Sequence, residues 1–167
     1  MAGNIQVGIL MGSASDLPAM TAAGDVLDQL EIGYEIRIMS AHRTPKEADE
    51  FASTAAGRGI KVLICGAGMA AHLAGAVAGR TPLPVIGVPL NGSLDGLDAL
   101  LATVQMPPGV PVGTVAIGKA GAKNAAWLAA RIIGTGDAEV QQRVIAGFDA
   151  MADKVRAADA ELQASRG

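Results

Sequence analysis

Short apolar runs alternate along the chain with longer, alanine-rich segments whose apolar residues recur at helical spacing. The apolar runs have the length of β-strands and cover residues 5–11, 34–39, 60–66, 83–89 and 112–117. The segments between and after them predict helices near residues 16–31, 45–58, 69–80, 94–104 and 120–134. This alternation of strand and helix is typical of a parallel sheet with helices on both faces.

Several of the predicted strands, such as "IKVLICG" at residues 60–66, are apolar on both faces. Such strands are expected in a sheet that helices cover on both sides. Crossovers between parallel strands are right-handed, and five strands are too few for an eight-stranded α/β barrel. We therefore expect an α/β fold, a three-layer α/β/α sandwich with a doubly wound parallel sheet, over residues 1–136.

The last segment, residues 137–167, is charged, and its apolar residues fall at steps of three, four or seven. These residues are Val140, Val144, Phe148, Met151, Val155 and Leu162. The spacing predicts one amphipathic helix that follows the complete α/β unit. It either folds back on its own domain or forms an arm that packs on another subunit.

Composition and charge exclude several classes of protein. A chain of 167 residues, 50% of them apolar, can form one domain with a sizeable core. A net charge of −3 and an aromatic content of 2% offer neither attraction nor stacking surfaces to nucleic acid. Cys65 is the only cysteine, so no intramolecular disulfide can form. Because we find no signal peptide and no apolar run of about 18 residues, we expect a soluble cytoplasmic protein that does not bind membranes.

Candidate chemistry follows the first three predicted strands. In open α/β sheets, ligands bind beyond the carboxyl ends of the strands, near the point where strand order reverses. "GSASD" at 12–16, "SAHR" at 40–43 and "GAGMAAH" at 66–72 follow these strands. We therefore expect serine hydroxyls, a carboxylate, a guanidinium and both histidines of the chain to converge on one edge of the sheet.

The segment "MGSASD" is a Gly-Ser turn that leads into a helix. Backbone N–H groups and the hydroxyls of Ser13 and Ser15 suit a phosphate there, although either serine could simply cap the helix. Asp16 is a poor neighbour for phosphate but a good acceptor for ribose hydroxyls. The combination indicates a sugar phosphate as the ligand.

The segment "SAHRTPKE" divides into two parts. Thr44 to Glu47 has the sequence of a capping box with proline at the first helical position. The residues before it, Ser40 to Arg43, then project from the loop over the strand end. Arg43 can bind phosphate with two parallel hydrogen bonds. His42 is a candidate general acid–base, because the ordinary pKa of histidine, about 6.5, lies near neutrality.

The segment "GAGMAA" at 66–71 imitates a dinucleotide-binding fingerprint but follows the third strand, and no acidic residue lies about 20 positions later. Its glycines would let the backbone approach a flat ligand closely. His72 is expected inside the next helix, as a packing residue or as a ligand. The chain has no Walker A sequence, zinc-protease motif or Cys/His cluster, so we expect neither hydrolysis of a nucleoside triphosphate nor a metal.

The motifs "MGSASD", "SAHRTP", "GAGMAAHLAG", "LPVIGVP" and "VQMPPGVPVGTVAIGKAGAKNAAWLAA" together resemble the PurE family over about residues 5–135. The chain is similar to the class I branch, the N5-carboxyaminoimidazole ribonucleotide mutases of purine biosynthesis, which are isomerases. Class II members, which carboxylate aminoimidazole ribonucleotide directly with CO2, usually have lysine where this chain has Arg43.

The resemblance implies a flavodoxin-like sheet, a homo-octamer whose C-terminal helices reach across subunits, and a carboxylate shift without metal, ATP or organic cofactor. It also implies roles for single residues. Ser13, Ser40 and Arg43 would hold the phosphate of the ribonucleotide, and Ser15 would line the same pocket. Asp16 would hold the ribose. Gly68 and Met69 would face the imidazole, and His42 would be the general acid–base.

The chain departs from the usual family sequence at three positions of this third motif. Cys65 replaces an alanine, Met69 a glycine and Ala74 a proline. Met69 places a long side chain in the loop that is expected beside the base. Two other functions therefore stay open: direct carboxylation of aminoimidazole ribonucleotide with CO2, and a non-catalytic flavodoxin-like nucleotide-binding module.

Overall fold

A computed structural model describes residues 4–166 and contains one parallel, five-stranded sheet with the strand order β2-β1-β3-β4-β5. The strands are β1 (Ile5–Met11), β2 (Gly33–Ile38), β3 (Val62–Gly68), β4 (Val85–Leu90) and β5 (Gly113–Thr114). The helices are α1 (Leu17–Gln29), α2 (Pro45–Ala55), α3 (Leu73–Ala78), α4 (Leu97–Val104), α5 (Gly118–Gly134) and α6 (Ala138–Arg166). Two short 3-10 helices, η1 (Ala14–Asp16) and η2 (Ala56–Arg58), adjoin α1 and α2. The predicted doubly wound α/β sandwich is confirmed.

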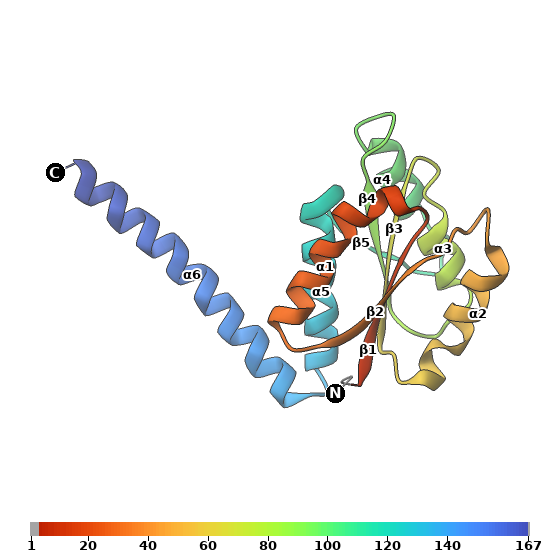
Figure 1. Ribbon diagram of the computed structural model, residues 1–167, viewed down its shortest axis with the longest axis horizontal. Helices are drawn as coiled ribbons and strands as arrows, with labels where there is room; N and C mark the ends of the chain where they lie inside the picture. The colour runs from red at the N-terminus through yellow and green to blue at the C-terminus, as the bar shows by residue number, and fades with distance from the viewer. Residues whose placement is uncertain (1–3, 167) are drawn as a thin grey trace.

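The sheet lies between two helical layers (Figure 1). Helices α1 and α5 cover one face, where they pack on Ile9 and Ile64. Helices α2 and α3 cover the other face, where Leu10 and Leu63 are buried. Successive residues of β1 and β3 thus point into different cores, because side chains alternate along a strand. This explains why both strands are apolar without interruption.

The strand order reverses between β1 and β3. From β1 the chain passes through α1 to β2 at one edge, and then crosses back through α2 to β3 on the other side of β1. This is the flavodoxin-like order, in which the ligand site lies beyond the carboxyl ends of the strands at the switch point. Met11 is in register with Gly66, so the segments that follow β1 and β3 lie next to each other at that edge.

Helices α3 and α4 begin later than predicted, and strand β5 is much shorter. Helix α3 begins at Leu73 rather than at 69, because Met69 has a left-handed backbone (φ 56°) that no right-handed helix accommodates. Helix α4 begins at Leu97 rather than at 94, because Asp95 and Gly96 are also left-handed. Strand β5 has two residues instead of the predicted 112–117, because only Gly113 and Thr114 are in register with β4.

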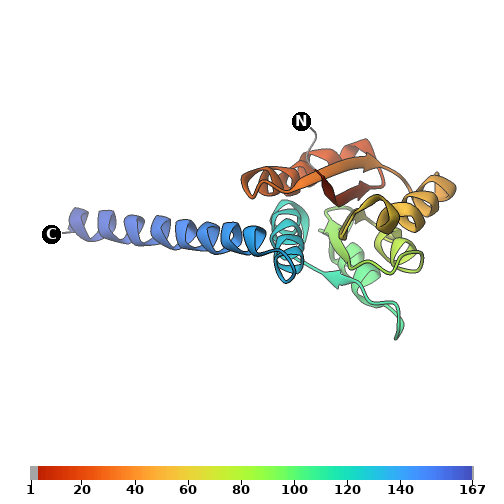
Figure 2. The same cartoon turned by 90° about the horizontal axis from the view of Figure 1, so that it is seen from below.

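Helix α6 has two parts with different surroundings. Its first turns pack on α5: Val140 and Val144 are buried, and the rings of Trp127 and Phe148 stack with centroids 5.2 Å apart. Beyond Phe148 the helix extends away from the sandwich (Figures 1 and 2). Its apolar residues there stay exposed, namely Met151, Val155 and Leu162. The proximal part is thus folded back on its own domain, and the role of the distal part as an intersubunit arm stays a prediction.

Among residues 4–166, no helix combines the length and the apolar character that crossing a membrane requires.

Candidate active site

A cavity of about 550 Å³ lies at the switch point of the sheet. Its size is typical of small-molecule sites. Segments that follow β1, β2, β3 and β4 form its walls. All residues that the sequence predicted for the site line this cavity, namely Ser13, Ser15, Asp16, Ser40, His42, Arg43, Gly68 and Met69. The structure therefore brings them together, although their individual roles stay predictions.

The segment after β1 is held by its own side chains. The backbone N–H of Ser15 donates to Ser13 Oγ at 3.3 Å, and the two hydroxyl oxygens are 3.0 Å apart. The N–H of Ser13 donates to Asp16 Oδ2 at 3.0 Å. Ser13 is thus the N-cap of η1, and the capping interpretation of this segment is correct. Ser13 and Ser15 nevertheless line the cavity, so capping and ligand binding are compatible here.

Asp16 is a partly buried carboxyl at the edge of the cavity. Burial raises its pKa above the ordinary value of 3.8, because desolvation disfavours the charged form. The hydrogen bond from the Ser13 N–H and the positive charge of Arg43 act in the opposite direction but are weaker. A carboxylate that has lost part of its hydration gains more from new hydroxyl donors, as a ribose would supply.

Ser40 organises the loop after β2. Its Oγ accepts the backbone N–H groups of His42 (3.3 Å) and Arg43 (3.2 Å). Thr44 does not form the predicted capping box: its hydroxyl makes no cap bond, accepts the Ser40 N–H at 2.8 Å and lies 3.3 Å from the Ser40 carbonyl oxygen. The reason is that the loop closes on itself through Ser40 before α2 starts. Pro45 is the first residue of α2, as predicted.

Arg43 connects two loops of the site. Its guanidinium donates to the backbone carbonyl of Gly12 at 2.7 Å. This bond holds the positive charge beside the serine segment, where Ser13 and Ser15 lie. A guanidinium has five N–H donors, so this contact leaves others for a phosphate.

The two histidines of the chain meet in the cavity. His42 Nε2 and His72 Nδ1 are 2.8 Å apart, and the rings are nearly perpendicular, at 83°. One of these nitrogens must carry the shared proton while the other accepts it. His72 lies just before α3 rather than inside it, and it is exposed rather than packed among helices. The sequence left its role open, and the structure places it in the site.

The segment after β3 brings backbone close to the cavity. Gly68 pairs with Leu90 at the ends of β3 and β4, and a Cβ there would make an ordinary contact, 3.4 Å from the Leu90 carbonyl oxygen. Met69 follows with its left-handed backbone and an exposed side chain.

Sequence reasoning missed Asn91 and Gly92, which line the cavity directly after β4. A signal existed, since the rule that ligands bind at the carboxyl ends of strands applies to the fourth strand as well. Cys65 lies within β3, is buried and does not line the cavity. Burial raises the pKa of its thiol to about 12, which makes it a poor nucleophile.

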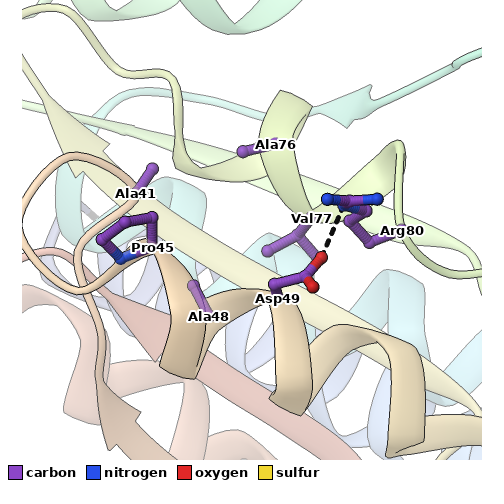
Figure 3. A pocket seen from close by; sticks show the side chains of 7 residues that line it. All are labelled: Ala41, Pro45, Ala48, Asp49, Ala76, Val77 and Arg80. Carbon is purple, nitrogen blue, oxygen red and sulfur yellow. Dashed lines mark ion pairs between the residues drawn. The ribbon is translucent and has the colours of Figure 1, made fainter.

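A second hollow lies behind the His42 loop, between α2 and α3 (Figure 3). Its volume is about 190 Å³, and an ion pair between Arg80 Nε and Asp49 Oδ1, 2.5 Å apart, closes one side. Ala41 lines both this hollow and the larger cavity. The Asp49 carboxyl of the small hollow is paired with Arg80, and the hollow has neither a histidine nor the volume of a substrate site, so the larger cavity is the candidate active site.

The chain belongs to the AIR carboxylase family, whose sequence model matches residues 6–154. Among curated proteins, it is 53% identical to an N5-carboxyaminoimidazole ribonucleotide mutase of Mycobacterium leprae, over 97% of this chain and 94% of that protein. It is 55% identical to the Bacillus subtilis protein of the same name, over 83% and 86% of the two chains. The crystal structure of Treponema denticola PurE superposes with a TM-score of 0.85 at 32% identity, covering 94% of this chain and 98% of that one.

Proposed function

We propose that this protein is an isomerase of purine biosynthesis that converts N5-carboxyaminoimidazole ribonucleotide to 4-carboxy-5-aminoimidazole ribonucleotide. Curated relatives more than 50% identical over most of the chain carry the name of that mutase. The observation that carries the proposal is the cavity itself, which combines Arg43 and serine hydroxyls with the His42–His72 pair. Such a site can hold a phosphate at one end and transfer protons at the other.

The phosphate of the substrate binds where Arg43 lies beside Ser13 and Ser15. The Ser40 hydroxyl keeps its own O–H free to donate, since its oxygen accepts the two loop N–H groups. Asp16 accepts the ribose hydroxyls. Anchoring the ribose phosphate along the first two loops directs the imidazole toward the histidines and the Gly68 backbone, and this positioning lowers the barrier of the carboxyl transfer.

The chemistry requires one proton to move in each direction. When the bond between the exocyclic nitrogen and the carboxyl group breaks, CO2 forms and the nitrogen takes a proton from His42. The ring carbon then forms a bond to the same CO2, and the proton on that carbon returns to His42. The reaction therefore needs no external acid, base or oxidant, and one histidine restores its own protonation state.

His72 positions His42 for these steps. Its Nδ1 shares a proton with His42 Nε2 at 2.8 Å, so it fixes the ring orientation and the protonated nitrogen of His42. In this mechanism His42 is the catalytic residue and His72 the positioning residue.

A direct test supplies the purified protein with each possible substrate. We expect turnover of N5-carboxyaminoimidazole ribonucleotide without added bicarbonate. Turnover only of aminoimidazole ribonucleotide with CO2 would contradict the mutase and support the direct carboxylase, a function that the name of the matching family also describes. His42→Asn should lose turnover by about 10²–10⁴-fold while still binding substrate. Unchanged function in that variant would support a non-catalytic binding module instead.

We also propose that the chain acts as a cytoplasmic homo-octamer. An octamer with two kinds of symmetry axis needs at least two separate interfaces. Two exposed apolar stripes lie within residues 4–166, one on distal α6 and one on and before α4. The second consists of Leu94, Leu97, Leu101 and Val104, each about half exposed or more.

The native mass tests this assembly. We expect about 134 kDa, eight times the 16.7 kDa of one chain. Removal of residues 149–167 retains the packing of Val140 and Val144 on α5 but deletes the arm, and should reduce the mass. A full-length monomer in solution would contradict the proposal.

A further inference from the structure

Met69 has a conformation that the stability of the fold does not explain. Its φ of 56° is left-handed, which is unfavourable for a residue with a Cβ, because that atom comes too close to the following carbonyl oxygen. Its apolar side chain is 62% exposed, so the conformation is not compensated by burial in the core. Strained backbone at a cavity is a feature of sites that contact ligands.

The side chain of Met69 lies between two loops of the active site. A Cβ built on Gly92 would be 3.3 Å from Met69 Cγ and 3.5 Å from Met69 N. A residue with a side chain at position 92 would make a tight contact with Met69, and glycine avoids that contact. Both residues line the same cavity as His42 and His72. Met69 and His72 belong to one loop, in which the Ala71 N–H donates to the Met69 carbonyl oxygen at 2.9 Å, so the methionine lies in the segment that supplies His72 to the cavity.

We propose that Met69 contacts the substrate and forms an apolar cover over the reacting end of the cavity. This inference rests on the proposed mutase function and adds a substrate-contacting residue to it. The reaction passes through CO2, a small uncharged molecule that no hydrogen bond or ion pair of the site can hold firmly. A flexible thioether side chain adapts to irregular apolar surfaces and excludes water. Contact with the substrate buries the methionine, which is the compensation that the free chain lacks.

Two variants at position 69 distinguish the effect of the apolar side chain from the effect of the left-handed backbone. Met69→Gly removes the side chain and accepts φ 56° without strain. Met69→Leu keeps an apolar side chain of similar volume and the same left-handed backbone. Turnover is measured with unlabelled N5-carboxyaminoimidazole ribonucleotide in buffer that contains ¹³C-labelled CO2 and bicarbonate. Label in the product shows that the original CO2 escaped after it left the nitrogen and before the ring carbon bound it.

We expect Met69→Gly to lower kcat/KM about tenfold and to increase labelled product and released aminoimidazole ribonucleotide by a similar factor. The same variant should melt about 2–4 °C higher, because the strain is removed. Met69→Leu should retain the melting temperature of the unmodified chain. It should also transfer the released CO2 to the ring carbon as efficiently as the unmodified chain does. Gly92→Ala adds a methyl group against Met69 without removing the methionine. This variant should give labelled product in an amount between those of the unmodified chain and Met69→Gly.

Equal label incorporation and equal kcat/KM in Met69→Gly and the unmodified chain would overturn the inference. So would equal losses in Met69→Gly and Met69→Leu, since the apolar cover would then not matter. Failure of the unmodified chain to convert the substrate would instead overturn the proposed function.

Discussion

His42 Nε2 lies 2.8 Å from His72 Nδ1, although 30 positions separate the two residues and they follow different strands. The orientation of each ring depends on the other, because one of the two nitrogens donates a single shared proton and the other accepts it. His72→Asn should therefore lower kcat about 10–100-fold, as loss of an orienting partner does elsewhere, and leave KM nearly unchanged. The pH profile of kcat should shift as well.

The shift of the pH profile distinguishes positioning from folding. A variant that only destabilised the fold would lose active protein without moving the profile. The matched comparison is His42→Asn, which should lose more activity than His72→Asn, with little further loss when both changes are combined.

Arg43→Lys should weaken substrate binding with little effect on the chemical step. Lysine keeps the charge but cannot donate to the Gly12 carbonyl and present two parallel donors to a phosphate at the same time. We expect KM to rise about 10–100-fold, the value of a charge-assisted hydrogen bond, with kcat changed less than about threefold. Arg80→Lys is the control, because Arg80 pairs with Asp49 in the small hollow and not in the active site. An equal rise of KM in both variants would contradict the assignment.

Asp16→Asn should make the substrate-free protein more stable at neutral pH. Because burial raises the pKa of Asp16 in the folded chain above 3.8, the folded state binds more protons than the unfolded state between the two values. The stability of the unmodified chain therefore falls as pH rises through that interval. Asparagine does not titrate there and can still accept the Ser13 N–H.

The expected gain at pH 7 is below about 1 kcal/mol, because the carboxyl is partly open to water. Urea denaturation at several values between pH 4 and pH 8 measures it, and the difference between the two proteins should shrink toward pH 4. A difference that is constant over this range is the contradicting result. Substrate affinity should fall in the same variant if Asp16 binds the ribose.

Gly147→Ala should destabilise the junction of α5 and α6. A methyl group at Gly147 would overlap the ring of Trp127, which stacks on Phe148. The overlap should cost about 1–3 kcal/mol, more than the roughly 1 kcal/mol that alanine gains over glycine within a helix. Gly57→Ala in η2 is the matched control, because nothing lies within 4 Å of a Cβ there, and it should be neutral or stabilising. Thermal unfolding of both variants measures the difference, and equal melting temperatures would show that the ring moves aside freely.

The sheet could be predicted from the sequence because β1 and β3 are apolar on two faces and therefore leave no alternative to a covered parallel sheet. The ends of the predicted strands then located the loops of the site, because the rule that ligands bind beyond the carboxyl ends of parallel strands depends on topology alone. The sequence could not give the start of α3, because no residue pattern shows that Met69 is left-handed. It could not give the partner of His42 either, since the distance to His72 depends on two loops that only the folded sheet brings together.

The exposed apolar residues of distal α6 make the stability of the folded chain depend on the concentration of any surface that covers them. Val155 is 71% exposed and Leu162 51%, so the free energy of their burial is absent from a single chain. Any surface that covers them binds the folded chain and not the unfolded one, and mass action then adds to stability as that surface becomes more abundant. If the covering surface is another copy, the melting temperature becomes a measure of how much protein is present, and dilution alone should lower it.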